Sequence, residues 1–300
     1  MEETFGRLLR TVQQARSKVM DVGASYGVTA SQVSVLGAVA HTPGIDQRGV
    51  SAATFIDKST VASVVTKLVE RGLLVSSRNG ADGRRDELVA TAEAVDLVYV
   101  TSIALLGGDE AMLAVLPASQ RRRFLRLLRQ VAYADRHDPP AVYVVPSPDG
   151  VRPPLEVPWG LGRSLRGCLQ RHTRLWTERF GSLVTPVQYL ALKALDHPYE
   201  IDQRTLGSSI VLGKASLTEM LDRLQRNGLV AKFRDPADGR RRILELTDSG
   251  RVLLSIVDSL APEVDAAFLS PLPPGQRQFF TKALRRLAVA SRTQSTLAER

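Results

Sequence analysis

The sequence predicts a mainly α-helical protein of the α+β type, in which two similar domains follow one another along the chain. One observation is that the segment Ala81-Asp82-Gly83-Arg84-Arg85 returns at residues 237–241, an offset of 238 minus 82, or 156 residues. A second is that the same offset pairs Ile45-Asp46-Gln47-Arg48 with residues 201–204 and continues without a gap from about residue 6 to about residue 132. A repeat of this length predicts a duplicated and diverged domain.

The composition fits two domains of ordinary size that bind a polyanion. A chain of 300 residues suffices for two hydrophobic cores. Lysine and arginine number 40 against 31 aspartate and glutamate, and this formal net charge of +9 favours a partner such as nucleic acid. Of these cations 33 are arginine and 7 are lysine, and genomic base composition explains this excess of arginine over lysine equally well. The single cysteine, Cys168, excludes an internal disulfide framework and fits a reducing compartment.

The N-terminus and the apolar stretches predict a cytoplasmic protein. Met1-Glu2-Glu3 lacks the basic start and the apolar core of a signal peptide. The apolar stretch at residues 97–106 is interrupted by Thr101 and Ser102 and reaches about half of the roughly 20 residues that a membrane span needs. We therefore expect no transmembrane helix and no membrane partner.

A proline-rich segment separates the two copies. Seven prolines lie between residues 137 and 158, so we expect a semi-rigid, extended linker. The apolar run at residues 141–145 leaves open that part of the linker lies along a domain surface or adds a strand. The predicted organisation is a first domain at 1–136, the linker at 137–158, a second domain at 159–292 and a C-terminal tail at 293–300.

Both copies contain the same order of elements. Thr29 and Thr185 fit N-cap positions, and Gly72 and Gly228 fit the residue that follows the end of a helix. In the first copy the pattern predicts four helices, at 3–24, after 29, at 46–55 and at 58–71. In the second copy the equivalent helices are at 159–181, after 185, at 202–211 and at 214–227. Two short strands, a long helix from about 91 or 247 and a final helix at 119–134 or 275–290 follow.

The fourth and the final helix of a copy each have one apolar side. In the fourth helices the apolar side chains recur at helical spacing, and they are Val61, Val64, Val65 and Leu68, and Leu217, Met220, Leu221 and Leu224. The final helix of the first copy repeats the pattern with Phe124, Leu127, Leu128 and Val131. The first and last helices carry more apolar surface than a compact three-helix domain can cover, so we expect them to form an interface. Core packing within each domain is the alternative.

The other face of the fourth helix predicts contact with DNA. In a helix-turn-helix the second helix enters the major groove, and a basic hairpin beside it can reach the minor groove. Hydroxyl side chains can contact base edges, whereas lysine and arginine can contact phosphates. The candidates in the two copies are Lys58, Ser59, Thr60, Ser63, Thr66 and Lys67, and Lys214, Ser216, Thr218 and Arg223.

Two sets of motifs point to one protein family. The first copy has Asp57-Lys58-Ser59-Thr60-Val61 leading to residues 68–74 and to Asp82-Gly83-Arg84, and the second has residues 224–230 leading to residues 234–240. With these motifs both copies resemble the MarR family of winged helix-turn-helix transcription regulators. The resemblance implies wing arginines that enter the minor groove and aspartates that orient them. The wing residues are then Asp82, Arg84, Arg85, Asp238, Arg240 and Arg241.

The resemblance also implies how the two copies work together. Members of the family normally act as homodimers with interlocking terminal helices, and this chain holds both halves. We therefore expect a monomeric, intramolecular pseudo-dimer on double-stranded DNA, with a homodimer of such chains as the alternative. Glu219 and Asp222 stand where the first copy has Ser63 and Thr66, and carboxylates are repelled by phosphates. We expect an asymmetric site, with more of the base readout in the first copy.

The function implied by the resemblance is sequence-specific transcription regulation, most often repression in this family. One alternative is an architectural DNA-binding protein, which the basic charge favours. Another is a regulator whose second domain has become a ligand- or protein-interaction module. The sequence presents no nucleophile with a base, no phosphate loop and no paired carboxylates, so we expect no catalytic residue and no enzyme activity.

An effector is a further expectation from the resemblance, since small phenolic or other aromatic compounds often release such regulators from DNA. The candidate lining of a site for a small aromatic ligand is Arg174, Trp176, Arg179 and Tyr189, with aromatic core residues and solvated arginines as the alternative. Cys168 aligns with Val12, so a buried apolar position explains it better than a redox sensor. His41 and His197 end equivalent helices, where a cation is favoured. No metal site and no cofactor are expected.

Overall fold

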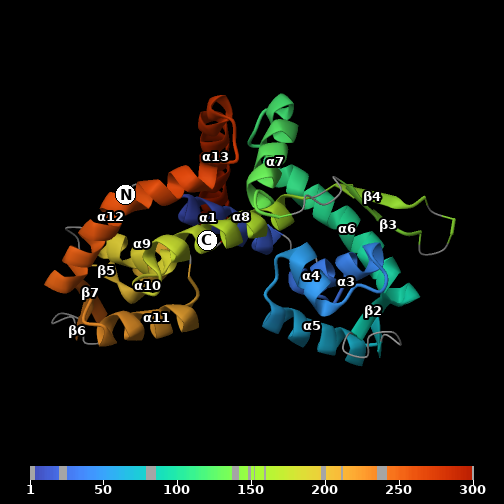
Figure 1. Ribbon diagram of the computed structural model, residues 1–300, viewed down its shortest axis with the longest axis horizontal. Helices are drawn as coiled ribbons and strands as arrows, with labels where there is room; N and C mark the ends of the chain where they lie inside the picture. The colour runs from blue at the N-terminus through green and yellow to red at the C-terminus, as the bar shows by residue number, and fades with distance from the viewer. Residues whose placement is uncertain are drawn as a thin grey trace. The chain divides into compact units, whose positions relative to one another are not determined.

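The computed structural model describes residues 4–19, 26–78, 86–136, 142–147, 150–151, 153–158, 160–196, 201–210, 212–234 and 242–298 (Figure 1). These residues form two compact units. The first-repeat unit consists of the described residues within Val12–Cys168 and Phe279–Arg300, and the second-repeat unit of those within Met1–Thr11 and Leu169–Gln278. Each unit therefore contains residues from both copies of the repeat.

The first-repeat unit contains a helix-turn-helix and a two-stranded wing. Thr29 begins the second helix with a reciprocal cap, in which its hydroxyl accepts from the Gln32 N–H and the Gln32 side chain accepts from the Thr29 N–H. The fourth helix of each copy, α5 (Lys58–Glu70) or α11 (Lys214–Arg226), is called the recognition helix below. Gly72 follows the recognition helix α5 at a φ of 70°. The elements are α1 (Phe5–Val19, from residue 12), α3 (Ala30–His41), α4 (Gln47–Thr54), α5 (Lys58–Glu70), β1 (Leu74–Arg78), β2 (Asp86–Ala90), α6 (Ala92–Leu113) and α7 (Ala118–Ala132).

The second-repeat unit repeats this order. Thr185 caps its second helix through the same reciprocal bonds with Gln188, and Gly228 follows its recognition helix at a φ of 68°. The elements are α8 (Leu161–Phe180, from residue 169), α9 (Pro186–Leu195), β5 (Ile201–Asp202), α10 (Gln203–Ile210), α11 (Lys214–Arg226), β6 (Val230–Arg234), β7 (Arg242–Leu246), α12 (Asp248–Leu269) and α13 (Pro274–Ala298, up to residue 278).

An antiparallel hairpin follows the recognition helix in each unit. Strand β1 pairs with β2, and β6 pairs with β7. In the second-repeat unit β5 adds a third strand, giving the order β5-β7-β6. In the first-repeat unit the equivalent place holds an isolated bridge between Ile45 and Leu88. The wing is therefore the same antiparallel hairpin in both units, and the sheet of the second unit has one strand more.

The apolar side predicted for each recognition helix faces a core. The fully buried members are Val61, Val65 and Leu68 on α5, and Leu217, Leu221 and Leu224 on α11. Val64 and Met220 are half-buried at the edge of the same cores. Full burial of an aliphatic side chain of this size contributes about 1.5–3 kcal/mol. The predicted stripes are confirmed, and they leave the other side of each helix exposed.

The outer helices pack residues of one copy against residues of the other. In the first-repeat unit the rings of Phe124 on α7 and Phe280 on α13 stack with centroids 5.8 Å apart, and both side chains are fully buried. In the second-repeat unit Phe5 on α1 lies 5.0 Å from Phe268 on α12. These contacts confirm the interface expected for the first and last helices. Helix α13 also continues to Ala298, beyond the end predicted at residue 290.

The proline-rich segment between the copies contains a hairpin. Strands β3 (Val142–Val145) and β4 (Leu155–Pro158) pair antiparallel, and Val145 and Val157 are buried in the core of the first-repeat unit. The backbone N–H of Val144 donates to Nδ1 of His41 over 3.3 Å. Part of the predicted linker is thus a folded hairpin, as its apolar run allowed, because two valines gain burial there. His41 thus accepts a hydrogen bond from strand β3 of this hairpin. His197 lies outside the described residues.

In the described part of the chain, no single helix is long and apolar enough to cross a membrane. Helices α6 and α7 meet the length and composition criteria only when they are taken together, and a bend of 111° separates them.

A histidine without a described hydrogen-bond partner lies in the core of the second-repeat unit. His172 on α8 is buried beside Trp176 and Phe268, with ring centroids 6.0 and 5.8 Å away. A Cβ on Gly6 of α1 would lie 2.8 Å from its Cε1 atom, so only glycine lets the two helices approach this closely. Burial, and secondarily the charge of Arg10, lowers the pKa of His172 from 6.5 to about 4.

This histidine makes the stability of the chain depend on pH. The unfolded chain takes up a proton near pH 6.5, whereas the folded chain takes it up only near pH 4, so stability is lost as pH falls through this window. We expect His172 to account for a loss of roughly 3 kcal/mol in the free energy of unfolding between these limits. Urea unfolding of His172→Phe at both limits should show a smaller loss than the parent chain. An equal loss in the two proteins would contradict this role.

Candidate DNA-binding interface

The exposed face of α5 begins with an aspartate that organises its first turn. Asp57 is the N-cap and accepts from the Thr60 N–H over 2.8 Å. It also accepts from the hydroxyls of Ser59 and Thr60 over 2.6 and 2.7 Å. These bonds lower the pKa of Asp57, so its carboxylate stays charged at the positive end of the helix. Because both hydroxyl protons point at Asp57, Ser59 and Thr60 can act only as acceptors toward a further hydrogen-bond partner.

The remaining candidates on α5 follow along the same exposed face. Lys58, Ser63, Thr66 and Lys67 are exposed. The hydroxyl of Thr66 donates to the carbonyl of Ala62 over 3.0 Å, whereas the side chain of Ser63 makes no hydrogen bond within the described residues. The structure thus collects the predicted residues of α5 on one accessible surface, with cations at both ends of the helix.

The corresponding face of α11 has a different chemistry. Its N-cap is Gly213, which provides no side-chain cap. The hydroxyl of Thr218 donates to the Lys214 carbonyl over 3.0 Å and accepts from the Gln203 side chain over 3.0 Å. Arg223 pairs with Glu219 one turn away, at 3.6 Å between nitrogen and oxygen. Ser216 and Arg223 are exposed like the other candidates of this helix.

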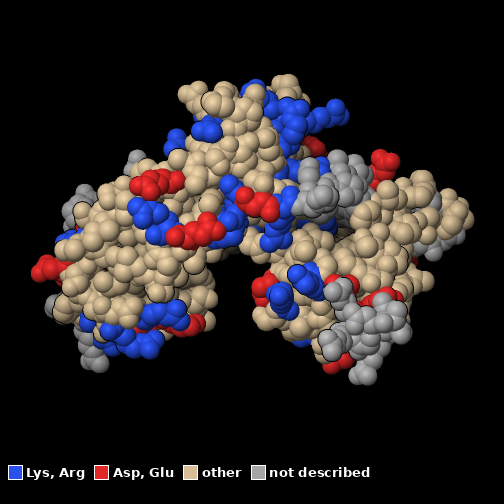
Figure 2. Space-filling view, in the orientation of Figure 1, with Lys and Arg blue, Asp and Glu red and all other residues tan. Residues whose placement is uncertain are grey.

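The face of α11 is also hollowed and carries charges of both signs. An open concavity of about 630 Å³ is lined by Lys214, Ala215, Thr218, Glu219 and Asp222. Figure 2 shows basic and acidic side chains side by side over this helix. The two recognition faces are therefore chemically unequal, as the sequence predicts.

The wing tips lie outside the described residues. The strands reach Arg78 and Asp86 in one hairpin and Arg234 and Arg242 in the other, and each pair is in register. The residues predicted to probe the minor groove are Asp82, Arg84, Arg85, Asp238, Arg240 and Arg241, and all six fall in the intervening segments. The described strands fix only where each tip starts and ends.

The residues predicted to line a ligand site lie in two environments. Trp176 and Tyr189 are buried in the core with ring centroids 5.0 Å apart, and they donate to the Val184 carbonyl and to Asp258. Arg174 and Arg179 pair with Glu178 and Glu263 on the surface. This placement matches the alternative of aromatic core residues and solvated arginines, and a ligand contact of these four residues stays a prediction.

Cys168 has the environment of a structural residue. Its side chain is fully buried in the first-repeat unit, and its Sγ lies 3.3 Å from the carbonyl oxygen of Leu128. Burial raises the pKa of the thiol, which disfavours the thiolate that oxidation requires. The expectation of a buried apolar position is confirmed. Among the described residues no cluster of histidine, cysteine and carboxylate side chains could hold a metal ion.

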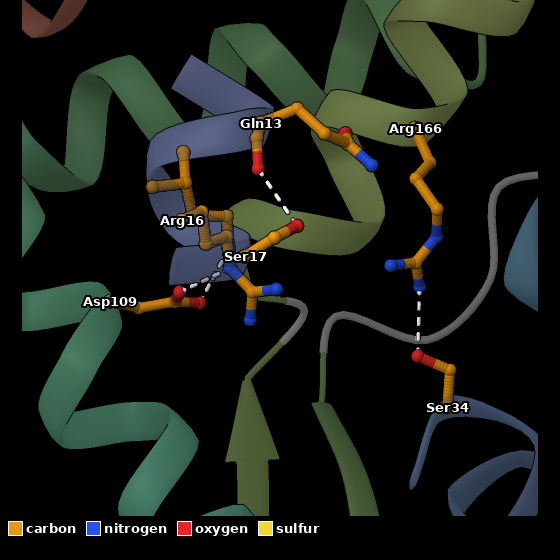
Figure 3. Close-up of polar contacts among 7 residues, drawn as sticks. Gln13, Arg16, Ser17, Ser34, Asp109 and Arg166 are labelled. Carbon is orange, nitrogen blue, oxygen red and sulfur yellow. Dashed lines mark hydrogen bonds and ion pairs between the residues drawn. The ribbon is translucent and has the colours of Figure 1, made fainter. Parts of the chain in front are cut away.

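A polar cluster in the first-repeat unit ties together helices from both copies. The Nε of Arg16 on α1 donates to Asp109 on α6 over 2.6 Å, and the Leu161 N–H at the start of α8 donates to the same carboxylate over 2.9 Å. Burial raises the pKa of Asp109, and the charge of Arg16 with these hydrogen bonds opposes the rise. Figure 3 shows Arg16 and Asp109 pointing at one another.

A second half-buried arginine joins this cluster to the helix-turn-helix. Arg166 on α8 donates to the Thr54 carbonyl over 2.9 Å. It also donates to the Ser34 hydroxyl over 3.1 Å, as Figure 3 shows. Burial, together with the charges of Arg16 and Arg163, lowers its pKa to about 9, so it remains charged at neutral pH. Through Arg166 the second copy of the repeat contacts α3 and the end of α4, which carry the recognition helix of the first copy.

Sequence reasoning assigned no role of its own to four residues of these sites. Asp57 precedes the recognition helix and fits the rule for N-caps, so the sequence held a usable signal for its role. Arg16, Asp109 and Arg166 gave none, because their contacts join residues 93 to 132 positions apart. Such pairs become visible only when the helices are placed.

Comparison with known proteins finds one family in both copies. The MarR family matches residues 26–85 and again residues 184–241. The Transcriptional regulator HosA of Escherichia coli O111:H- is 35% identical over 123 residues, which cover 41% of this chain and 90% of the relative. The HTH-type transcriptional repressor NicR of Pseudomonas putida is 29% identical over 135 residues, covering 45% of this chain and 85% of the relative. Of solved structures, the PcaV transcriptional regulator from Streptomyces coelicolor in complex with its natural ligand is 35% identical, covers 44% of this chain and 93% of its own, and has a TM-score of 0.40.

Replacement of Asp57 by alanine should loosen the start of α5. The Thr60 amide loses its acceptor, and both neighbouring hydroxyls lose theirs. We expect several-fold faster hydrogen exchange at the Thr60 amide, with the centre of the helix unaffected. Asp57→Asn keeps an acceptor and should retain most of the protection, and Ser63→Ala is the matched control. Unchanged exchange in Asp57→Ala would disprove the capping role.

Removal of one partner of the Arg16–Asp109 pair should cost more than removal of both. Their side chains are only 13% and 10% exposed, so Asp109→Ala leaves a guanidinium without its counter-charge in a poorly hydrated place. We expect a loss of about 3–5 kcal/mol in the free energy of unfolding, most of it recovered in the double variant Arg16→Met, Asp109→Leu. Denaturant unfolding of the three proteins provides the comparison. Equal losses in the single and double variants would contradict the pairing argument.

Proposed function

Because this chain belongs to the MarR family, whose members are DNA-binding winged-helix regulators of transcription, we propose that it is a sequence-specific repressor built from two unequal halves. The single observation that carries the proposal is the pair of recognition helices, α5 and α11, each with its apolar side buried and a different polar side exposed. In this account both helices enter the major groove of one double-stranded DNA site.

The site is asymmetric because equivalent positions of the two helices differ. Ser63 and Thr66 of α5 correspond to Glu219 and Asp222 of α11. Hydroxyls can accept from or donate to a base edge, whereas a carboxylate can only accept, for example from cytosine N4. The carboxylates also repel phosphates, an effect that the pairing of Glu219 with Arg223 reduces. Helix α5 therefore carries more of the base readout, and α11 favours bases that offer a donor.

The wings add contacts that do not depend on the major groove. Arg84 and Arg240 enter the minor groove on either side of the site, oriented by Asp82 and Asp238. The paired strands β1–β2 and β6–β7, which lead to the two tips, support this role. An arginine held by a carboxylate loses less conformational entropy on binding, and a narrow minor groove attracts it.

One chain supplies both halves of the regulator. The support is that residues of both copies pack together within each compact unit, as Phe124 does with Phe280 and Phe5 with Phe268. A homodimeric relative obtains such contacts from two chains. In this protein the same contacts are intramolecular, so the monomer is competent to bind DNA and the two halves can diverge.

A small-molecule effector fits the proposed repressor. In the first-repeat unit, half-buried Arg166 bonds to Thr54 and Ser34 next to the recognition helix, and the buried Oγ of Ser164, two residues away, has no described partner. A ligand that drew Arg166 away from α3 and α4 would disturb the helix-turn-helix and release DNA. The four candidates of the second-repeat unit offer less, because Trp176 and Tyr189 lie in the core whereas Arg174 and Arg179 pair with carboxylates on the surface.

A second candidate function rests on the concavity of α11. Its lining carries Glu219 and Asp222, which suit a basic protein partner better than a phosphate backbone. In that case α5 alone would read DNA, and the bound sequence would be a single half-site.

Selection of bound sequences from a random pool of duplex DNA tests the proposal. We expect one motif with two unequal halves in adjacent major grooves. Ser63→Ala combined with Thr66→Ala should lower affinity for the selected duplex by about tenfold or more and blur one half of the motif, since a base contact contributes about 1–3 kcal/mol. Glu219→Gln is the matched change on α11 and should alter the other half less. No enrichment would refute sequence-specific binding, a single half-site would support the second candidate, and a stronger effect of Glu219→Gln would reverse the ranking.

A further inference from the structure

Two helices that pack together in the first-repeat unit carry no carboxylates of their own. Helix α7 and the part of α13 from residue 279 to residue 298 contain no aspartate or glutamate. They meet at the stacked rings of Phe124 and Phe280, and the guanidinium of Arg123 lies 4.1 Å above the ring of Phe279. The basic residues of these two helical segments, together called the basic surface below, are Arg121, Arg122, Arg123, Arg126, Arg129, Lys282, Arg285, Arg286 and Arg292.

Four of these cations are exposed and unpaired within the described residues. Arg122 and Arg126 lie one turn apart on α7, and Lys282 and Arg286 lie one turn apart on α13. None of the four takes part in an ion pair or a hydrogen bond with another described residue. Arg121, at the start of α7, pairs with Glu110 at 3.4 Å between nitrogen and oxygen.

Such an arrangement is unfavourable for the chain on its own. Like charges one turn apart on a helix repel each other, and both helices carry such a pair. Elsewhere the exposed cations Arg174, Arg179 and Arg251 each have a carboxylate partner within 3.0 Å. The chain therefore neutralises many of its surface cations but leaves Arg122, Arg126, Lys282 and Arg286 for a partner.

The basic surface is remote from the recognition helix of the same unit. In Figure 1 helices α7 and α5 lie at opposite ends of the first-repeat unit, and Figure 2 shows basic side chains gathered over α7. A duplex that occupies α5 cannot reach these cations without bending around the unit. The basic surface must then serve a second anionic partner.

The side chains favour a nucleic-acid backbone over an acidic protein. Protein interfaces centre on buried aromatic or aliphatic anchors, whereas Val289 is the one large apolar side chain among the described residues of α7 and α13 that is markedly exposed. Arginine binds phosphate through a rigid fork of donors, and phosphate contacts make up most of sequence-independent DNA binding. Two helices with cations one turn apart offer a row of such contacts.

We propose that the basic surface of α7 and α13 binds the phosphate backbone of a second DNA duplex, so that one chain bridges two duplexes. The contact is independent of base sequence and of the proposed operator. It gives the protein a second activity, the joining of DNA segments, in addition to the recognition of a site.

A bridging assay with the full chain tests this activity. A short duplex of mixed sequence is fixed to beads and saturated with protein, and after washing a fluorescent duplex of another mixed sequence is added. The parent chain should capture the second duplex. If all four cations contact phosphates, the salt dependence of capture should have a slope of about 3.6 on logarithmic axes, from about 0.9 per contact.

The variants separate the basic surface from overall charge. Arg122→Gln with Arg126→Gln, and Lys282→Gln with Arg286→Gln, each remove two cations of this surface. Lys193→Gln with Arg251→Gln removes the same charge from residues that pair with Asp258 and Asp196, so it is the matched control. We expect each surface pair to lower capture by about tenfold at moderate salt. Binding to the fixed duplex should change little, which also shows that the variants are folded.

The outcomes are distinct. Equal capture by the surface variants and the control would overturn the proposal, as would bridging complexes that contain two chains. Replacement of the second duplex by fluorescent polyglutamate covers the acidic-protein alternative, and capture of the peptide without capture of the duplex would also overturn it. Because both duplexes have mixed sequence, the assay does not depend on an operator, and the failure of either proposal can be told from the failure of the other.

Discussion

The outer helices of each repeat are buried by residues of the other repeat, and the rest of the structure depends on this packing. Phe124 of the first copy is fully buried against Phe280 of the second, and Phe5 of the first lies against Phe268 of the second. Asp109 adds polar contacts of the same kind, because it accepts from Arg16 and from the backbone of Leu161. Neither copy contains on its own all the residues of one compact unit. Large apolar side chains left without these contacts would expose surface that folding normally removes from water.

Covalent joining of the two copies removes the constraint of symmetry. In a homodimer each substitution appears twice, so both halves must change together. In this chain equivalent positions of the two copies now hold different residues with different roles. Arg16 forms an ion pair with Asp109, whereas its counterpart His172, 156 residues later, is buried among aromatic rings and has its pKa lowered. The recognition helices have diverged in the same way, from a capped, hydroxyl-rich start at Asp57 to an uncapped start at Gly213.

Much of the fold could be predicted from the sequence, because local signals determine it. Thr29, Thr185, Gly72 and Gly228 mark helix ends through capping and left-handed conformation, and the structure confirms each of them. The apolar stripes placed α5 and α11 correctly. The hairpin of β3 and β4 was only an alternative, since its stability comes from the burial of Val145 and Val157 in a core formed by distant residues.

The candidate interface could be predicted only in part. The residues of α5 and α11 lie on exposed faces as their spacing required. What the spacing could not reveal is which hydroxyls are engaged, because that depends on Asp57 and Gln203. The buried contacts of Arg16 and Arg166 join helices that are far apart along the chain, and charge alone did not distinguish these arginines from solvated ones.

The central claim is that one chain supplies both recognition helices for one DNA site. Native mass spectrometry of the protein bound to a duplex with the selected motif tests it most directly. The account predicts one chain of 32.7 kDa per duplex at all protein concentrations that saturate the site. A complex that always contains two chains per duplex would contradict it.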